Sequence, residues 1–206
     1  MVCYSLEKKI IYIHIPKTGG TSIEKILIDK YNFKNFTFNN GPYEFLNLEE
    51  GKKGFFKYIL NHSDESKKYN LVSWKKFTFV RNPISRAVSG IKYLLDYSNN
   101  ISTMAEFYSF CEVNPFFYNH FLLSQSDILK NLDGNIQIDY IGRFENFLPD
   151  LEKILFDEFC FDRQDISKYH LNSRNHRIFQ IDINILNEII REIHKEDFIN
   201  FNYSIN

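Results

Sequence analysis

A strand-like run that ends in a proline and two glycines is the feature that most restricts how this chain can fold. Residues 10–15 read IIYIHI and predict a buried strand, and residues 21–30 read TSIEKILIDK, with apolar side chains at helical spacing. Between them lies PKTGG, residues 16–20. Glycines allow backbone torsions that other residues resist, so successive N–H groups can point at one anion. The order strand, glycine loop, helix therefore predicts an anion-binding turn.

The polar groups of this loop suit a phosphate. Lys17 supplies a full positive charge, and the expected helix N-terminus adds about half of one. Further backbone or hydroxyl donors come from Thr18, Gly19, Gly20, Thr21 and Ser22. A Walker A loop places its lysine after the glycines, whereas Lys17 precedes them, so a different phosphate loop is expected. A plain strand-to-helix turn is the alternative, and His14 is expected to be a packed, hydrogen-bonded side chain.

A second segment repeats this design. KFTFV, residues 76–80, is a strand candidate that ends at Arg81, and Pro83 opens an expected helix that runs to about residue 97. Ser89 lies eight residues beyond Arg81 and can face the strand end if the helix folds back along the sheet. Arginine is suited to a bidentate grip on phosphate. Taken alone, Arg81 could be a solvent-exposed residue that caps the helix N-terminus. Together, the two segments predict a ligand with phosphates at two separate places.

The rest of the chain alternates between strand and helix patterns. Strands are expected at 55–60 and 136–141, helices at 103–112, 145–158 (disturbed at Pro149) and 182–195, and an irregular excursion at 31–54. This alternation predicts an α/β fold, with a central parallel β-sheet flanked by helices in a single domain over residues 1–206. Ligands of such sheets bind at the carboxyl ends of the strands, where both loops are expected.

Charge and composition exclude several classes of partner. The formal net charge of −1 gives no reason to expect nucleic acid or an anionic membrane surface. The apolar runs are too short for a membrane span or a secretory signal. Three cysteines without CxxC spacing fit free thiols in a reducing compartment, so a cytoplasmic location is expected. The sequence contains no HxxxH pattern and no Cys/His cluster of the kind that would predict a metal site.

Both loops resemble a known family. HIPKTGGTS, residues 14–22, and FTFVRNPISRAVSG, residues 77–90, are similar to the two donor-binding motifs of the sulfotransferases, particularly the carbohydrate O-sulfotransferase branch. IGRFENFLPDLEKIL, residues 141–155, and DFINFNY, residues 197–203, resemble later family segments. The resemblance implies a P-loop-like sulfotransferase fold that uses 3′-phosphoadenosine 5′-phosphosulfate (PAPS) as donor and releases adenosine 3′,5′-bisphosphate (PAP), with no metal.

The resemblance also implies how the donor is held. Residues Lys17 to Ser22 would bind the 5′-phosphosulfate, and Arg81 and Ser89 the 3′-phosphate. Ser173 and Arg174 lie in KYHLNSRNHR, residues 168–177, which is similar to a loop that closes over the 3′-phosphate. A solvated loop is the alternative for that segment. Phe144 aligns with an aromatic residue that lies beside the adenine of the donor in members of the family.

Sulfuryl transfer needs a base for the acceptor hydroxyl and a cation for the leaving phosphate. Lys17 suits the second task. His62 follows the expected strand at 55–60, and family members resembling this chain carry a histidine there that is proposed as the base. Asp64 and Glu65 are neighbouring candidates for the base. The alternative for His62 is a surface or capping histidine without a catalytic role.

Two further residues match the acceptor side of the family. His120 and Gln125, in NHFLLSQSD, are similar to a segment that lines the acceptor cleft, with a hydrogen-bonded structural role as the alternative. The segments 31–54 and 97–130 are expected to shape that cleft. The leading hypothesis is a PAPS-dependent O-sulfotransferase that acts on a glycan, glycolipid or glycoside. A small-metabolite kinase and a non-catalytic nucleotide-binding module are the alternatives.

Overall fold

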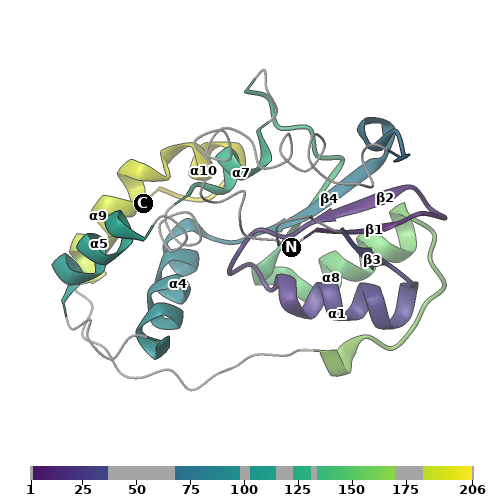
Figure 1. The fold of residues 1–206 in the computed structure, drawn as a ribbon, viewed down its shortest axis with the longest axis horizontal. Helices are drawn as coiled ribbons and strands as arrows, with labels where there is room; N and C mark the ends of the chain where they lie inside the picture. Colours follow the sequence, from purple (N-terminus) through teal and green to yellow (C-terminus); the bar gives the residue numbers. More distant parts are fainter. Residues whose placement is uncertain are drawn as a thin grey trace.

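The computed structural model describes residues 2–36, 68–97, 103–114, 123–130, 134–169 and 183–205. These residues form a five-stranded sheet with helices on both faces (Figure 1). The strands are β1 (Val2–Ser5), β2 (Ile10–Ile13), β3 (Lys34–Asn35), β4 (Lys75–Val80) and β5 (Tyr140–Arg143), in the order β3-β1-β2-β4-β5. The expected α/β class is therefore confirmed. The expected strand at 55–60 lies outside the described residues.

The sheet is mixed rather than wholly parallel. Strands β2, β4 and β5 are parallel, as expected, but β1 pairs antiparallel with β2, and β3 pairs antiparallel with β1. Neither β1 nor β3 was expected from the sequence. β1 and β2 form a hairpin through residues 6–9, where Lys9 takes a φ of 55°. A short hairpin can join only antiparallel strands, which explains this departure from the parallel prediction.

The parallel register brings the two phosphate-loop candidates to the same edge of the sheet. Ile13 lies opposite Thr78, and the Thr78 hydroxyl donates a 2.7 Å hydrogen bond to the Ile13 carbonyl. Val80, in turn, lies opposite Arg143. The chain segments that leave β2, β4 and β5 at their carboxyl ends are therefore neighbours. This placement confirms the expected position of both motifs.

One face of the sheet is covered by α1 (Gly20–Tyr31) and α8 (Phe147–Glu152), which lie below the sheet in Figure 1. Their apolar residues pack against Ile10 and Tyr12 of β2 and against Phe77 and Phe79 of β4. The helix expected over 145–158 begins as a 3₁₀ turn at Phe144–Asn146 and ends as a π-helix at Lys153–Glu158. Pro149 lies in the first turn of α8, where its missing N–H costs nothing, and it does not interrupt the helix.

The opposite face contacts α7 (Gln125–Leu129) and Phe201. A separate apolar cluster joins α4 (Pro83–Tyr97), α5 (Met104–Val113), α9 (Ile183–Ile193) and α10 (Lys195–Asn200). The family-like segment DFINFNY, residues 197–203, therefore begins within α10. No helix in the described ranges is long and apolar enough to cross a membrane.

Candidate functional site

The first motif is a tight turn between β2 and α1. Lys17 has a φ of 68° and Gly19 a φ of 84°. The Thr18 hydroxyl donates a 2.8 Å hydrogen bond to the Ile15 carbonyl, so it braces the turn from inside. The N–H of Ser22 donates to the Gly19 carbonyl at 3.0 Å, which starts the helix. Helix geometry leaves the first N–H groups of α1 without an intrahelical acceptor, so the turn can present them to an anion.

Lys17 holds a backbone conformation that favours glycine. A left-handed φ costs a residue with a side chain about 1–2 kcal/mol. Residues other than glycine in such conformations cluster at functional sites, where the function of the side chain requires the strained backbone. The Lys17 ammonium lies 4.2 Å from the centroid of the Tyr93 ring, which α4 provides. The turn thus holds a cation at the end of β2, over an aromatic ring.

Gly20 is required by the close approach of His14. A Cβ atom at Gly20 would lie 2.0 Å from His14 Cδ2. On its other side, His14 Nδ1 lies 3.0 Å from Glu24 Oε1, and both side chains are largely buried. Burial lowers the pKa of His14, against the opposing effect of the Glu24 carboxylate. His14 is therefore a packed histidine beneath the loop, as expected.

Replacement of Gly20 by alanine is expected to lower the free energy of unfolding by about 1–3 kcal/mol, the usual cost of overpacking. The new Cβ would overlap the His14 ring. Urea denaturation measures this change. In a His14→Ala background the same substitution should cost much less, because the clashing ring is gone. An equal cost in both backgrounds would contradict the contact.

The second motif places Arg81 directly beside the first. Arg81 Nη1 donates to the Lys17 carbonyl at 3.4 Å, and its Cζ lies 4.2 Å from the centroid of the Phe144 ring. Burial lowers the pKa of Arg81, with Glu145 acting in the opposite direction. Arg81 Nε is buried without a hydrogen-bond acceptor in the described part of the chain. An unsatisfied buried donor costs about 1–3 kcal/mol, which an anion could remove.

α4 begins immediately after Arg81 with a capped first turn. The Asn82 side chain accepts the N–H of Ser85 at 3.1 Å, and the Asn82 N–H donates to Glu145 Oε1 at 2.7 Å. Pro83 occupies the first helical position, where it is favoured. Ser89 lies half-buried further along the same helix. The sequence thus predicted this helix start, but it gave no signal for the contact with Glu145.

Arg86 is a buried structural residue that the sequence reading missed. Its Nε donates to the Pro16 carbonyl at 3.0 Å, and its Nη1 donates to the Leu123 carbonyl at 2.9 Å. Burial lowers the pKa of Arg86 to about 10, with Asp197 opposing, so the side chain remains charged at neutral pH. Arg86 thereby fixes the first motif to α4 and to the segment before α7.

The structure brings some of the expected site residues together and leaves others outside the described ranges. Lys17, Arg81 and Phe144 are neighbours. Gln125 is fully buried and hydrogen-bonded to the backbone of Arg81, which matches the structural role considered for it. The expected residues that lie outside the described ranges are His62, Asp64, Glu65, His120, Ser173 and Arg174.

The arrangement is suited to an extended anion. Two cationic side chains lie at one sheet edge, next to a helix N-terminus and a half-buried aromatic ring. Within the described ranges, no group of three His, Cys, Asp or Glu residues is placed to hold a metal ion. A family model described as "Sulfotransferase family" matches residues 2–204. No significant match was found among curated proteins or among solved structures.

Proposed function

Because the chain belongs to the sulfotransferase family, we propose that it transfers a sulfuryl group from PAPS to a hydroxyl of a carbohydrate or glycoconjugate. The observation that carries this proposal is the pairing of the two motifs at one edge of the sheet. Arg81 Nη1 lies 3.4 Å from the Lys17 carbonyl, so the Arg81 side chain contacts the loop that carries Lys17. PAPS carries phosphate at both its 5′ and 3′ positions and matches such a pair.

Each part of the donor has a proposed partner. The 5′-phosphosulfate lies in the first loop, against Lys17, Thr18, Gly19, Gly20, Thr21 and Ser22. Thr18 takes part through its backbone N–H, because its buried hydroxyl is bonded to the Ile15 carbonyl. The 3′-phosphate binds Arg81 and Ser89, with Ser173 and Arg174 contributing from the later loop. The adenine lies beside Phe144, whose ring already stacks on the Arg81 guanidinium. Stacking of a base on an aromatic side chain contributes about 1–3 kcal/mol.

The proposed reaction is an in-line displacement at sulfur. A bond forms between the acceptor oxygen and sulfur, while the bond between sulfur and the phosphate oxygen breaks. His62 takes the proton of the acceptor hydroxyl, and Lys17 stabilises the charge on the departing phosphate. PAP leaves with one phosphate at each of two positions, so a lysine and backbone N–H groups suffice and we propose no metal.

The acceptor is proposed to be a glycan, glycolipid or smaller glycoside. The small net charge of −1 favours these over a heavily sulfated polymer, which a strongly basic surface would attract. We further propose that residues 1–206 form one sulfotransferase domain and that the protein works in the cytoplasm. An acceptor screen with labelled PAPS would identify the hydroxyl.

Isothermal titration tests the donor assignment. PAP is expected to bind without Mg²⁺ and at least about tenfold more tightly than ATP, because only PAP offers a 3′-phosphate to Arg81. ATP also carries a triphosphate, for which this loop lacks the Walker A arrangement. Tighter binding of ATP, particularly with Mg²⁺, would instead favour a kinase. PAP binding without transfer to any acceptor would favour a non-catalytic nucleotide-binding module.

A further inference from the structure

Asp197 lies in α10, remote in sequence from both donor motifs, yet it is fully buried behind them. We propose that Asp197 and Gln125 form a positioning relay that holds Arg81 for the 3′-phosphate. Neither residue would touch the nucleotide. The relay would determine how strongly the protein distinguishes a nucleotide with a 3′-phosphate from one without it. This inference rests on the proposed function, which supplies the ligand of Arg81.

The first link joins Gln125 to the backbone of Arg81 on both sides. Gln125 Oε1 accepts the Arg81 N–H at 2.9 Å, and Gln125 Nε2 donates to the Arg81 carbonyl at 2.8 Å. This amide therefore fixes both peptide groups that flank the Arg81 Cα. The direction in which a side chain leaves the backbone depends on those peptide groups. Gln125 consequently controls where the guanidinium can reach.

The second link joins Gln125 to Asp197. One carboxylate oxygen, Oδ2, accepts the backbone N–H of Gln125 at 2.8 Å and lies 3.4 Å from Gln125 Nε2. The other oxygen, Oδ1, accepts the N–H of Ser126 at 2.7 Å. The carboxylate thus holds the first residues of α7 and orients the Gln125 amide. Because Gln125 and Asp197 are both fully buried, water cannot replace these bonds.

Two cationic or titratable neighbours complete the surroundings of the carboxylate. His194 Nδ1 lies 3.4 Å from Asp197 Oδ2, and the Arg86 charge also acts on Asp197. Burial raises the pKa of Asp197, but the adjacent His194 imidazole, hydrogen bonds from the α7 backbone and the Arg86 charge hold it below its ordinary value. Asp197 is therefore ionised at neutral pH. Arg86 also binds the Pro16 carbonyl at 3.0 Å, so the charge that acts on Asp197 belongs to a side chain that contacts the first loop.

The relay can be tested through nucleotide selectivity. Titration calorimetry would compare the affinities of PAP and adenosine 5′-monophosphate, which differ only in the 3′-phosphate. In Gln125→Leu, the preference for PAP should fall by about tenfold or more, the usual effect of weakening a bond to a charged group. The affinity for the monophosphate should stay within about threefold of wild type. Asp197→Asn should lower the preference in the same direction, by a smaller factor.

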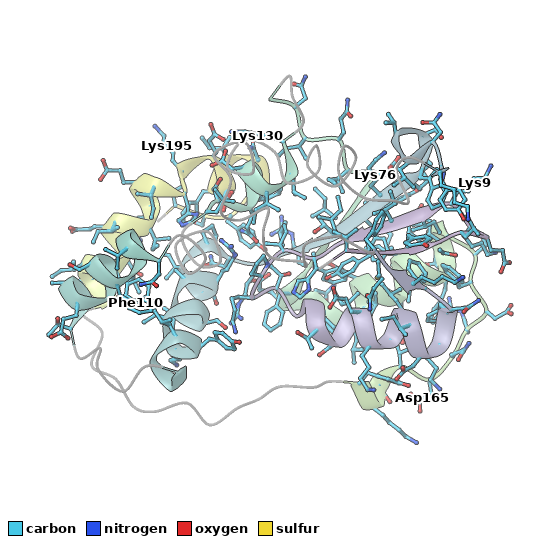
Figure 2. The ribbon with its side chains drawn as sticks, viewed as in Figure 1. Lys9, Lys76, Phe110, Lys130, Asp165 and Lys195 are labelled. Atoms are coloured by element: carbon cyan, nitrogen blue, oxygen red, sulfur yellow. The ribbon has the colours of Figure 1, made fainter. Side chains whose placement is uncertain are left out.

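Selectivity separates positioning from a purely structural role. A residue that only stabilises the fold would lower the melting temperature and leave the preference for PAP unchanged. Glu196→Gln is the matched control, because Glu196 joins α10 to Lys130 at the end of α7, but at the exposed surface. Figure 2 shows Lys130 and Lys195 on the outer side of these two helices. This control should keep the wild-type preference.

Two results would overturn the inference, and they are distinguishable from a failure of the proposed function. A wild-type preference for PAP in folded Gln125→Leu, or in Asp197→Asn, would exclude the relay. A wild-type protein that binds both nucleotides equally would instead refute the assignment of Arg81 to a 3′-phosphate. Arg81→Lys gives the reference for an impaired arginine. If the relay exists, Gln125→Leu should approach the selectivity of Arg81→Lys.

Discussion

Replacement of Lys17 by methionine is expected to lower kcat/KM for sulfuryl transfer by about 10²–10³-fold, the usual effect of removing one preorganised donor from a developing anion. The affinity for PAP should fall far less, because the loop backbone and Arg81 remain. The turn holds the Lys17 backbone at a φ of 68° and its ammonium 4.2 Å from the Tyr93 ring. The cation is therefore already in place before the reaction. Initial rates with saturating PAPS, together with PAP titrations, measure both effects.

Two further substitutions separate charge from fold. Lys17→Gly relieves the strain of the left-handed backbone, about 1–2 kcal/mol, and the larger unfolded-state entropy of glycine offsets roughly 0.5–1 kcal/mol of that gain, so the free energy of unfolding should stay within about 1 kcal/mol of wild type while activity is lost with the ammonium. Lys25→Met removes an exposed cation that pairs with Asp29 at 3.1 Å on the same helix, and it should keep full activity. Activity of Lys17→Met within about threefold of wild type would exclude this lysine from the chemistry.

Replacement of His62 by alanine is expected to lower turnover by about 10²–10⁴-fold, the usual contribution of a positioned general base. PAP should bind normally, because the proposed base contacts the acceptor and not the donor. A neutral imidazole is needed to take the hydroxyl proton, so the wild-type rate should fall at acidic pH, where the imidazole becomes protonated. Rate profiles between pH 5 and 8 measure this limb, which the variant should lack.

The neighbouring carboxylates provide the comparison for His62. Asp64→Asn and Glu65→Gln are expected to retain most of the activity and the wild-type pH profile. A large loss in either of them, with normal turnover in His62→Ala, would transfer the role of base to that carboxylate. Loss of PAP affinity in His62→Ala would point to a role in donor binding.

The two loops at the ends of β2 and β4 could be predicted because their signals are local. A strand pattern, a proline or glycine and a helix pattern follow one another within each motif, and parallel strands bring their carboxyl ends together. The β1–β2 hairpin gave no comparable signal. Its turn contains Lys9 at a φ of 55°, where a glycine or asparagine would ordinarily mark the position.

β5 lies further along the chain than the sequence predicted, and Asp139, just before it, contacts β4 through both its backbone and its side chain. The prediction placed a strand at 136–141, but β5 runs from Tyr140 to Arg143. Asp139 Oδ2 accepts the Lys76 N–H at 2.8 Å, so a carboxylate acts as the partner just before the ladder begins. Alternation of apolar residues alone could not reveal this contact. Ile136 instead forms an isolated bridge with Lys130.

The buried hydrogen bonds between Gln125 and Asp197, behind Arg81, could not be predicted from the sequence for a different reason. Gln125 and Asp197 are separated by 72 positions, and neither lies in a pattern that distinguishes a buried polar residue from an exposed one. Only the docking of α10 against α7 brings them together. The close packing of His14 on Gly20 is likewise a tertiary contact, although the glycine itself was part of the recognised loop.

The parallel pairing of β2 with β4 has a consequence for the order of folding. Hairpins such as β1–β2 close within about 1–10 μs, whereas the Thr78–Ile13 bond joins residues 65 positions apart. The chain must lose the entropy of that long closure before the pairing stabilises it. We therefore expect the edge that carries Lys17 and Arg81 to be completed late in folding. A nucleotide bound there would slow unfolding and leave the folding rate nearly unchanged.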